Sequence, residues 1–284
     1  MRKPGTSDCK ICGGNGFVIV RDKAVDCECI KQRRRDAAYD TIGIPRHLRS
    51  INIGDFEPKQ DATGVDHKQP EERQKHVASV LVSQYCDQVG ECLRTGNPFE
   101  LDPTLAYERD SDKKQQPLWR GHWVILSGEK STGKSLLVVI IAKAAVAAGG
   151  YPRILQWADV LDACYDFQSN SSYDALGVIF EKCSPILIEN VDQAYEDRAD
   201  FGSEFGSTLH PITKRRLDVL FSPVYSKSLP VVFTTSRKPP AIKSATESLG
   251  PLLGSILQAS AVIELPSREH AFNMTVLNAA GGAK

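Results

Sequence analysis

The segment GEKSTGKS at residues 128–135 combines glycines, a lysine and hydroxyl side chains at the spacing of a phosphate-binding loop. It fits the pattern G-x-x-x-x-G-K-[ST], in which Gly128 and Gly133 let the backbone curve so that its N–H groups face a polyphosphate. Lys134 would then reach the β- and γ-phosphates, and the Ser135 hydroxyl would bind Mg²⁺. The motif predicts an ATP site with the nucleotide-binding residues Gly128, Glu129, Lys130, Ser131, Thr132, Gly133, Lys134, Ser135 and Leu136.

An acid that would complete such a site follows the apolar segment ILI at residues 186–188. Glu189 ends this predicted strand, and a P-loop enzyme needs an acid there to hold Mg²⁺ directly or through water. Asn190 comes next, where this class of enzyme usually has a catalytic glutamate, and an amide orients water but does not accept its proton. Asp192, two residues further on, is an acid that would replace the catalytic glutamate if the turn after the strand brings it to the site. The alternative is that Glu189 only ends a strand.

Polar side chains also follow the apolar segment PVVFTT at residues 230–235. We expect this strand to lie beside the strand that precedes the glycine loop, which would let Ser236 and Arg237 contact the γ-phosphate. The alternative is a strand end that runs into a proline turn. The predicted catalytic set is Lys134, Glu189, Asn190, Asp192, Ser236 and Arg237.

Four cysteines near the N-terminus have the spacing C-x2-C-x14-C-x-C. The segment GFVIV at residues 16–20 predicts a strand, DKA at residues 22–24 a turn, and VDCEC at residues 25–29 the returning edge. Such a hairpin would bring the two cysteine pairs together at one end. We therefore predict a structural Zn²⁺ site without an open coordination position; a redox pair is the alternative. The zinc ligands would be Cys9, Cys12, Cys27 and Cys29.

Apolar runs alternate with helical patterns in the second half of the chain, as in a parallel α/β sheet. Strands are predicted at residues 123–127, 153–157, 185–189, 230–235 and 261–265. Helices are predicted at residues 30–40, from 71 onward, and at 134–148, 158–167, 211–226 and 250–258. The order of strands favours a P-loop class in which one extra strand lies between the strand of the lysine and that of the acid.

The chain is therefore predicted to contain a P-loop α/β core, with a parallel five-stranded sheet and flanking helices, plus a small N-terminal zinc-knuckle or ribbon module held by four cysteines. Residues 1–60 would form the zinc-binding and partner-binding module with its linker. Residues 61–121 would form a helix and a polar insertion, of which 96–121 is expected to be a long loop. Residues 122–284 would form the ATPase core.

Bulk composition excludes few function classes. The 284 residues include 35 Lys+Arg and 35 Asp+Glu, so the overall charge predicts no polyanionic partner. Lys and Arg outnumber Asp and Glu eleven to six in residues 1–50, which hints at nucleic acid or an acidic partner; the alternative is a solvated helix face. No signal peptide is evident, and the apolar stretch from Leu136 is interrupted by Lys143. We expect a cytoplasmic protein that does not bind membranes.

Taken in order, these motifs resemble those of the DnaC/DnaI-type replicative-helicase loaders of bacteria and phages. The resemblance extends over residues 9–60 and 120–270, and includes IGIPRHLRSINIGDF, TTSRKPP and GPLLGSILQASAVIEL. Over the predicted ATPase core the chain is also similar to the IstB transposition-helper ATPases. The resemblance implies an AAA+ fold of the ASCE class. It also implies three partners: a hexameric replicative helicase for the N-terminal module, and single-stranded DNA and neighbouring subunits for the core.

The same resemblance assigns roles to single positions. Glu189 falls where the family has the Walker B aspartate, Asn190 where it has the catalytic acid, and Ser236 or Arg237 at sensor 1. The family arginine that reaches the next subunit is absent, because its place contains Ile256. An upstream Arg-Tyr pair is also replaced. The family's Ser-Arg-Leu-like box reads Ser255-Ile256-Leu257 here, and its upstream Arg-Tyr pair reads Val224-Tyr225. Lys214, Arg215 and Arg216 are considered as substitutes for the missing arginine, and Arg268 as a second sensor.

These departures all predict slower hydrolysis, since an arginine supplied to a neighbouring site is worth roughly 10³–10⁵ in kcat. We expect an ATP-binding helicase-loader-like protein whose turnover is slow or depends on assembly, which leaves its status as an enzyme open. A catalytically weakened scaffold and a transposition-helper-like ATPase are the alternatives. A general DNA-binding zinc protein is less favoured, because no base-reading helix is evident.

Overall fold

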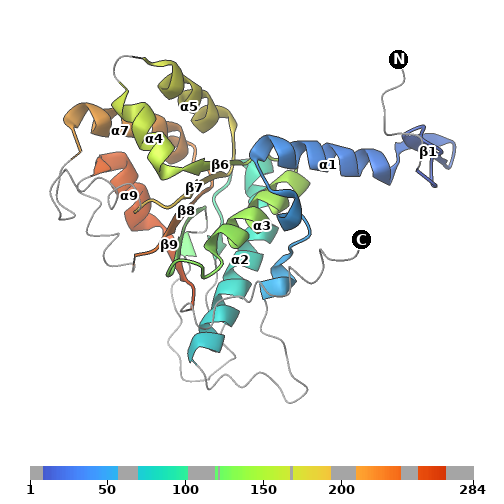
Figure 1. The fold of residues 1–284 in the computed structure, drawn as a ribbon, viewed down its shortest axis with the longest axis horizontal. Coiled ribbons are helices and arrows are strands. Elements are labelled where there is room, and N and C mark those ends of the chain that lie inside the picture. Colours follow the sequence, from blue (N-terminus) through green and yellow to red (C-terminus); the bar gives the residue numbers. More distant parts are fainter. Residues whose placement is uncertain are drawn as a thin grey trace. The chain divides into compact units, whose positions relative to one another are not determined.

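The chain forms two compact units, Met1–Arg49 and Ser50–Lys284, which we describe separately (Figure 1). The computed structural model describes residues 9–56, 70–101, 119–120, 122–166, 169–192, 209–237 and 249–266. The division into three parts at residues 60 and 121 stays a prediction. No helix within the described ranges is both long and apolar enough to cross a membrane.

The N-terminal unit begins with a hairpin of β1 (Phe17–Val20) and β2 (Lys23–Asp26), antiparallel from Phe17↔Asp26 to Val20↔Lys23. The turn occupies Arg21 and Asp22, both with positive φ, so it lies earlier than the predicted DKA turn. The predicted returning edge at residues 25–29 was wrong in its second half. The strand ends at Asp26, and Cys27 caps α1 (Glu28–Ile42), so Cys29 lies in the first helical turn.

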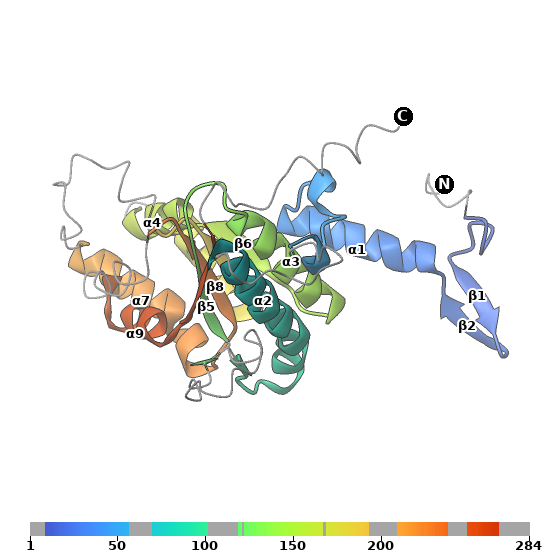
Figure 2. The same ribbon diagram turned by 90° about the horizontal axis from the view of Figure 1, so that it is seen from below.

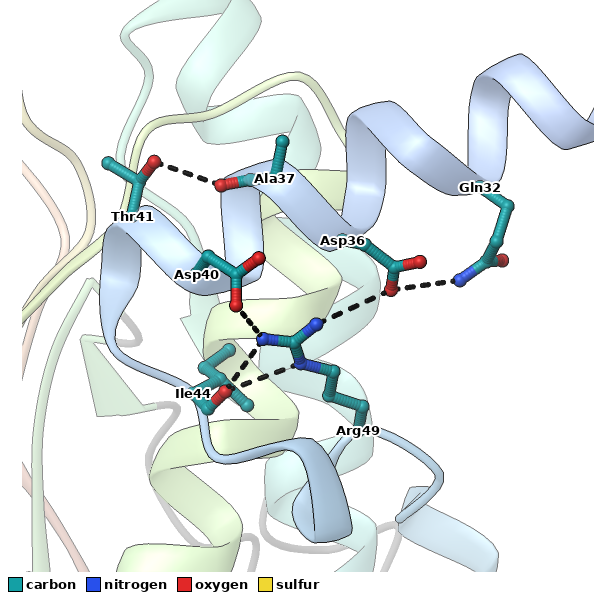
Figure 3. Close-up of polar contacts among 7 residues, drawn as sticks. All are labelled: Gln32, Asp36, Ala37, Asp40, Thr41, Ile44 and Arg49. Carbon is teal, nitrogen blue, oxygen red and sulfur yellow. Dashed lines mark hydrogen bonds and ion pairs between the residues drawn. The ribbon is translucent and has the colours of Figure 1, made fainter. Parts of the chain in front are cut away.

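The segment after α1 is bound back onto that helix by Arg49, as Figure 3 shows. The Arg49 guanidinium donates to the Ile44 carbonyl at 3.2 and 3.3 Å, and it pairs with Asp36 and Asp40, one helical turn apart. The short 3-10 helix η1 (Arg46–Leu48) lies within this segment. Much of the basic excess of residues 1–50 is therefore neutralised inside the unit, where Arg34 and Arg35 also pair with acids.

The second unit contains a parallel five-stranded sheet of order β6-β7-β8-β5-β9. Its strands are β5 (Trp123–Ser127), β6 (Arg153–Gln156), β7 (Ile186–Glu189), β8 (Val231–Thr235) and β9 (Ala261–Glu264). All five lie where apolar runs predicted them. β8 separates β5 from β7, so the predicted extra strand between the lysine strand and the acid strand is confirmed. This is the P-loop AAA+ arrangement expected from the sequence.

Helices cover both faces of this sheet (Figures 1 and 2). On one face α2 (Pro70–Thr95) packs against α3 (Lys134–Ala147). The other face carries α4 (Trp157–Tyr165), α5 (Ser171–Lys182), α7 (Pro211–Ser226) and α9 (Pro251–Ala259). The core on this second face contains buried aromatic side chains from helices and strands, namely Trp157, Phe180, Phe221 and Phe233. The removal of such apolar side chains from water is the main contribution to the stability of a layered fold.

Three features of the second unit differ from the sequence predictions. Helix α5 was not predicted, because its serine-rich start is typical of a loop; Leu176 and Phe180, four residues apart, bury its inner face. Within the expected loop 96–121, β3 (Glu100–Leu101) pairs with β4 (Trp119–Arg120), whereas 102–118 lie outside the described residues. A 3-10 helix, η2 (Ile53–Phe56), precedes α2.

Candidate nucleotide-binding and zinc sites

The glycine loop connects β5 to α3, which is the strand–loop–helix context that the motif requires. Gly133 has φ 100° at the N-cap of α3, a left-handed conformation that favours glycine. Gly128 is needed for space, because a Cβ there would lie 2.9 Å from Thr132 Oγ1 and 3.0 Å from Leu265 Cβ. Ser131 is also left-handed, with φ 69°. The loop therefore has the sharp curvature of a phosphate cradle at a helix N-terminus.

Lys134 folds back over this loop. Its Nζ donates to the carbonyl oxygens of Gly128 and Glu129, both at 2.6 Å, and the side chain is only 8% exposed. Burial lowers the pKa of Lys134, and the carboxylates of Asp192, Glu189 and, more weakly, Glu129 oppose this effect. A cation held at the loop by two neutral carbonyls is able to exchange them for phosphate oxygens, which are stronger acceptors.

The other predicted loop residues divide into exposed and buried positions. Glu129, Lys130, Ser131 and Ser135 are exposed to solvent. Thr132 is fully buried and its hydroxyl donates to the Glu129 carbonyl at 3.0 Å, which stabilises the loop itself. Leu136 is buried at 9% exposure, and its side chain belongs to the core.

Glu189 is the last residue of β7, at the carboxyl ends of the strands, where the glycine loop also begins. In the sheet it pairs in register with Gln156, the last residue of β6. Its Oε2 accepts from Gln156 Nε2 at 3.0 Å. Its Oε1 is buried and has no hydrogen-bond partner among the described residues. Buried polar atoms are almost always satisfied, and a carboxylate oxygen is a ligand that Mg²⁺ prefers. Ser135 and Glu189 therefore offer the kinds of oxygen atom that a magnesium ion takes as ligands.

Asn190 follows in the left-handed region, with φ 58°, a conformation that asparagine tolerates better than most residues. Its backbone N–H donates to Thr234 Oγ1 at 3.0 Å, and its Nδ2 donates to Gln156 Oε1 at 3.1 Å. Gln156 thus contacts both residues of the acid–amide pair. Sequence analysis did not single out Gln156. Its position at the end of a predicted strand was the available indication, but the pairing of that strand with β7 was not evident.

Asp192 and the residues after β8 form a second set of contacts. Asp192 is 5% exposed, and its Oδ2 accepts from the Ser236 backbone N–H at 3.0 Å and from the Ser236 hydroxyl. The Arg237 carbonyl accepts from the Ser127 hydroxyl at 2.7 Å, while the Arg237 side chain is half-buried. The Thr235 carbonyl accepts from the Gly128 N–H at 3.2 Å. The end of β8 is therefore bound to β5 on one side and to Asp192 on the other.

The arginine candidates have different surroundings. Ile256 is fully buried, so the position aligned with the family arginine faces the core, and α9 has no basic residue. Arg216 donates to the Asp166 carbonyl at 2.9 Å and to Asn170 Oδ1 at 2.7 Å, and it lies 4.8 Å over the Tyr173 ring. These contacts give Arg216 a structural role within its own chain. The other candidates are the half-buried Lys214, the exposed Arg215, and Arg268, which lies outside the described residues. Val224, which stands where the family often has an arginine, is buried, and Tyr225 stacks on Trp123.

The four N-terminal cysteines do come together. Their sulfur atoms all lie within 4.8 Å of one another, with Cys9–Cys27 at 3.8 Å and Cys12–Cys29 at 3.6 Å. Zn–S bonds of ~2.3 Å in a tetrahedron place the sulfurs about 3.8 Å apart, so the cluster fits Zn²⁺. The Gly16 N–H donates to Cys12 Sγ at 3.3 Å and is the main cause that lowers the pKa of Cys12 to about 6. Burial is the main cause that raises the pKa of Cys29 to about 12, so the metal assignment rests on the geometry of the four sulfurs and not on the acidity of the thiols.

No family model matches this sequence, and no curated protein matches it. Among solved structures, DnaI is similar at 13% identity and TM-score 0.44, over 79% of this chain and 94% of that chain. The DnaC helicase loader is similar at 10% identity and TM-score 0.45, over 78% and 99%. AMPPCP-bound DnaA from Aquifex aeolicus is similar at 13% identity and TM-score 0.38, over 50% of this chain.

This chain spans only 39% of that DnaA chain. Two of the three structures have the names of the loaders that the sequence resembles, and their similarity concerns the arrangement of the chain, not its function. The fold assignment rests on the chain's own features: the strand order, the glycine loop after β5 and the acid at the end of β7. These features identify the second unit as a P-loop AAA+ fold.

Proposed function

We propose that this protein binds ATP together with Mg²⁺ at the glycine loop. The observation that carries this proposal is the Lys134 ammonium group, buried and held by two loop carbonyls. Residues 128–135 would surround the phosphates, with Leu136 anchoring the loop in the core. Ser135 and Glu189 would hold Mg²⁺, which neutralises phosphate charge when bound. The partnerless Glu189 Oε1 supports this assignment.

Turnover in this proposal is slow or depends on assembly. Asn190 has no carboxylate that can accept a proton, and α9 offers no arginine to a neighbouring subunit. Each departure removes a group that lowers the barrier to phosphoryl transfer. ATP would then act mainly by favouring one conformation and one subunit interface over another. Self-association through the ATPase core is part of this proposal.

We further propose that the protein helps place a replicative DNA helicase on single-stranded DNA in the cytoplasm. The sequence motifs shared with helicase loaders support this role. The N-terminal unit, with Zn²⁺ held by its four cysteines, would contact the helicase. Its hairpin exposes large apolar side chains, with Phe17 48% and Ile19 72% exposed, and exposed apolar side chains of this kind are typical of a protein-binding surface. Since many of its basic residues pair internally, we assign single-stranded DNA to the core.

A catalytically weakened scaffold is the second candidate, and Asn190 together with the buried Ile256 favours it. A transposition-helper-like ATPase needs an arginine that serves the neighbouring site, so this chain supports it less well.

The test is binding of MgATP to the full chain, followed by loading of a replicative helicase on single-stranded DNA with and without ATP. We expect MgATP binding and ATP-dependent loading. Binding of MgATP with no effect on any step of helicase loading would favour the scaffold. Absence of MgATP binding would remove the nucleotide assignment itself.

A further inference from the structure

Polar side chains at the carboxyl end of β7 form two separate clusters. The edge cluster consists of Gln156, Glu189 and Asn190, and the inner cluster consists of Asp192 and Ser236. Glu189 and Asp192 are close in sequence, yet their hydrogen bonds go to different neighbouring strands. The strand order β6-β7-β8-β5 decides which of these clusters is closer to the glycine loop.

Gln156, which joins the members of the edge cluster, lies on the side of β7 away from the loop. Asn190 Nδ2 donates to Gln156 Oε1, and Gln156 Nε2 donates to Glu189 Oε2, so one glutamine amide satisfies both partners. Gln156 ends β6, the edge strand, and two strands separate it from β5. This bond orients the Asn190 amide toward β6, the edge strand. An acid substituted for Asn190 in the same orientation would also face β6.

The inner cluster lies on the opposite side of β7. Asp192 bonds to Ser236 directly after β8, and β8 is the immediate neighbour of β5, from which the loop begins. Both hydrogen bonds go to Asp192 Oδ2, which leaves Oδ1 without a hydrogen-bond partner among the described residues. The Gly128 N–H donates to the Thr235 carbonyl at 3.2 Å, and Thr235 directly precedes Ser236, so hydrogen bonds connect Asp192 through the end of β8 to the start of the glycine loop. Asp192 is therefore a buried acid beside the end of β8, on the side of β7 where the loop lies.

We propose that Asp192, not the residue at position 190, is the general base for the residual ATP hydrolysis of this protein. The inference rests on the proposed ATP site. In the step, a water oxygen forms a bond to the γ-phosphorus while Asp192 Oδ1 accepts one of its protons. The bond between the γ-phosphorus and the bridging oxygen breaks, and ADP leaves with that electron pair. Ser236 is a positioning residue that fixes the carboxylate through Oδ2. Gln156 holds Asn190 away from the reacting atoms.

The test uses the full chain in excess over MgATP, with and without single-stranded DNA, and measures MgATP affinity and the single-turnover rate separately. Asp192→Asn keeps an acceptor for Ser236 but removes the base. We expect it to lower the rate by on the order of 10²-fold or more, the loss typical of a general base, while affinity changes by less than about threefold. Asp174→Asn, an exposed acid in the first turn of α5, is the matched control and keeps the wild-type rate.

Further variants separate a chemical role from a structural one. Asp192→Glu keeps the carboxylate and should retain more turnover than Asp192→Asn, which also serves if Asp192→Asn does not fold. Asn190→Ala should lose less turnover than Asp192→Asn. An Asp192→Asn rate near wild type would overturn the inference, as would a wild type that binds MgATP without any turnover. Loss of MgATP binding in the wild type would instead overturn the proposed function.

Discussion

The cysteine cluster of the N-terminal unit has all of its ligand atoms in place, whereas the nucleotide site of the second unit has groups without partners. Four sulfurs within 4.8 Å of one another fill a tetrahedral coordination shell and leave no position for a substrate. Around the glycine loop, Lys134 is held by carbonyls, and Glu189 Oε1 has no partner among the described residues. A site of the first kind stabilises structure, and a site of the second kind responds to a ligand.

The two sites also differ in how far apart their residues lie in the sequence, and this separation affects whether a site can form without its ligand. The four cysteines come from twenty-one residues of one hairpin and helix start, Cys9 to Cys29, so in the proposed zinc site metal binding and folding would be one event. The nucleotide site takes groups from the ends of three strands that a five-stranded sheet already holds together. Because the sheet and not the ligand brings these groups together, the proposed ATP would be able to leave and rebind without loss of the fold.

The strongest test of the comparison is removal of the metal. We predict that Cys27→Ser, or chelation of the wild type, unfolds the hairpin, because structural zinc contributes roughly 10–16 kcal/mol of apparent binding energy in small modules. Hydrogen exchange should show the loss of amide protection in β1, β2 and the start of α1, while MgATP affinity is unchanged. Cys183→Ser is the matched control. Persistent protection after complete chelation would mean that the cluster is not a structural metal site.

The next largest effect is expected at Lys134. Lys134→Ala removes a charged hydrogen bond to phosphate worth about 1.5–3 kcal/mol, so MgATP affinity should fall by roughly 10- to 150-fold. Titration calorimetry measures this loss. Lys182→Ala, at the end of α5, removes the same charge far from the loop in sequence and should bind MgATP as the wild type does. An equal loss in both variants would show that general charge, not the loop, binds the nucleotide.

Sequence analysis predicted those parts that depend on neighbouring residues. The glycine loop at residues 128–135 and the five apolar strands are contiguous patterns, and the structure has both. The four cysteines were found because their spacing fits a known ligand set. In contrast, the first turn of α1 replaced half of the expected returning strand, because Cys27 makes no side-chain capping hydrogen bond and its residue type does not indicate the start of a helix.

Contacts between distant residues were not predictable in the same way. Gln156 lies 33 residues from Glu189, and Ser236 lies 44 from Asp192; both pairings require the strand order to be known. Helix α5 was missed because only Leu176 and Phe180 bury its inner face. Arg216 was considered as a possible substitute for the missing arginine, and only the position of the α4–α5 loop shows that it binds within its own chain.

Arg216 provides a test of intermediate size. Arg216→Ala removes hydrogen bonds from a half-buried guanidinium, so we expect the free energy of unfolding to fall by about 1–3 kcal/mol. Urea denaturation of the second unit measures the change. Arg216→Lys keeps the charge but not the planar fork, and should recover only part of the stability. If Arg216→Ala were fully stable but lost turnover in assembled protein, Arg216 would be the arginine that serves a neighbouring site, and the nucleotide site would be less incomplete than described above.

The smallest effect is expected for Asn190→Asp, which adds the carboxylate that the family pattern has at this position. Aspartate tolerates the left-handed backbone there, so the change tests chemistry without adding much strain. Since Gln156 orients this side chain toward β6, we expect the single-turnover rate to rise by less than about tenfold, well short of what a positioned base supplies. Adding Gln156→Ala frees the new carboxylate, and the double variant should exceed both single variants. A gain of about 10²-fold from Asn190→Asp alone would mean that side-chain identity, not orientation, limits this site, and it would contradict the role assigned to Asp192.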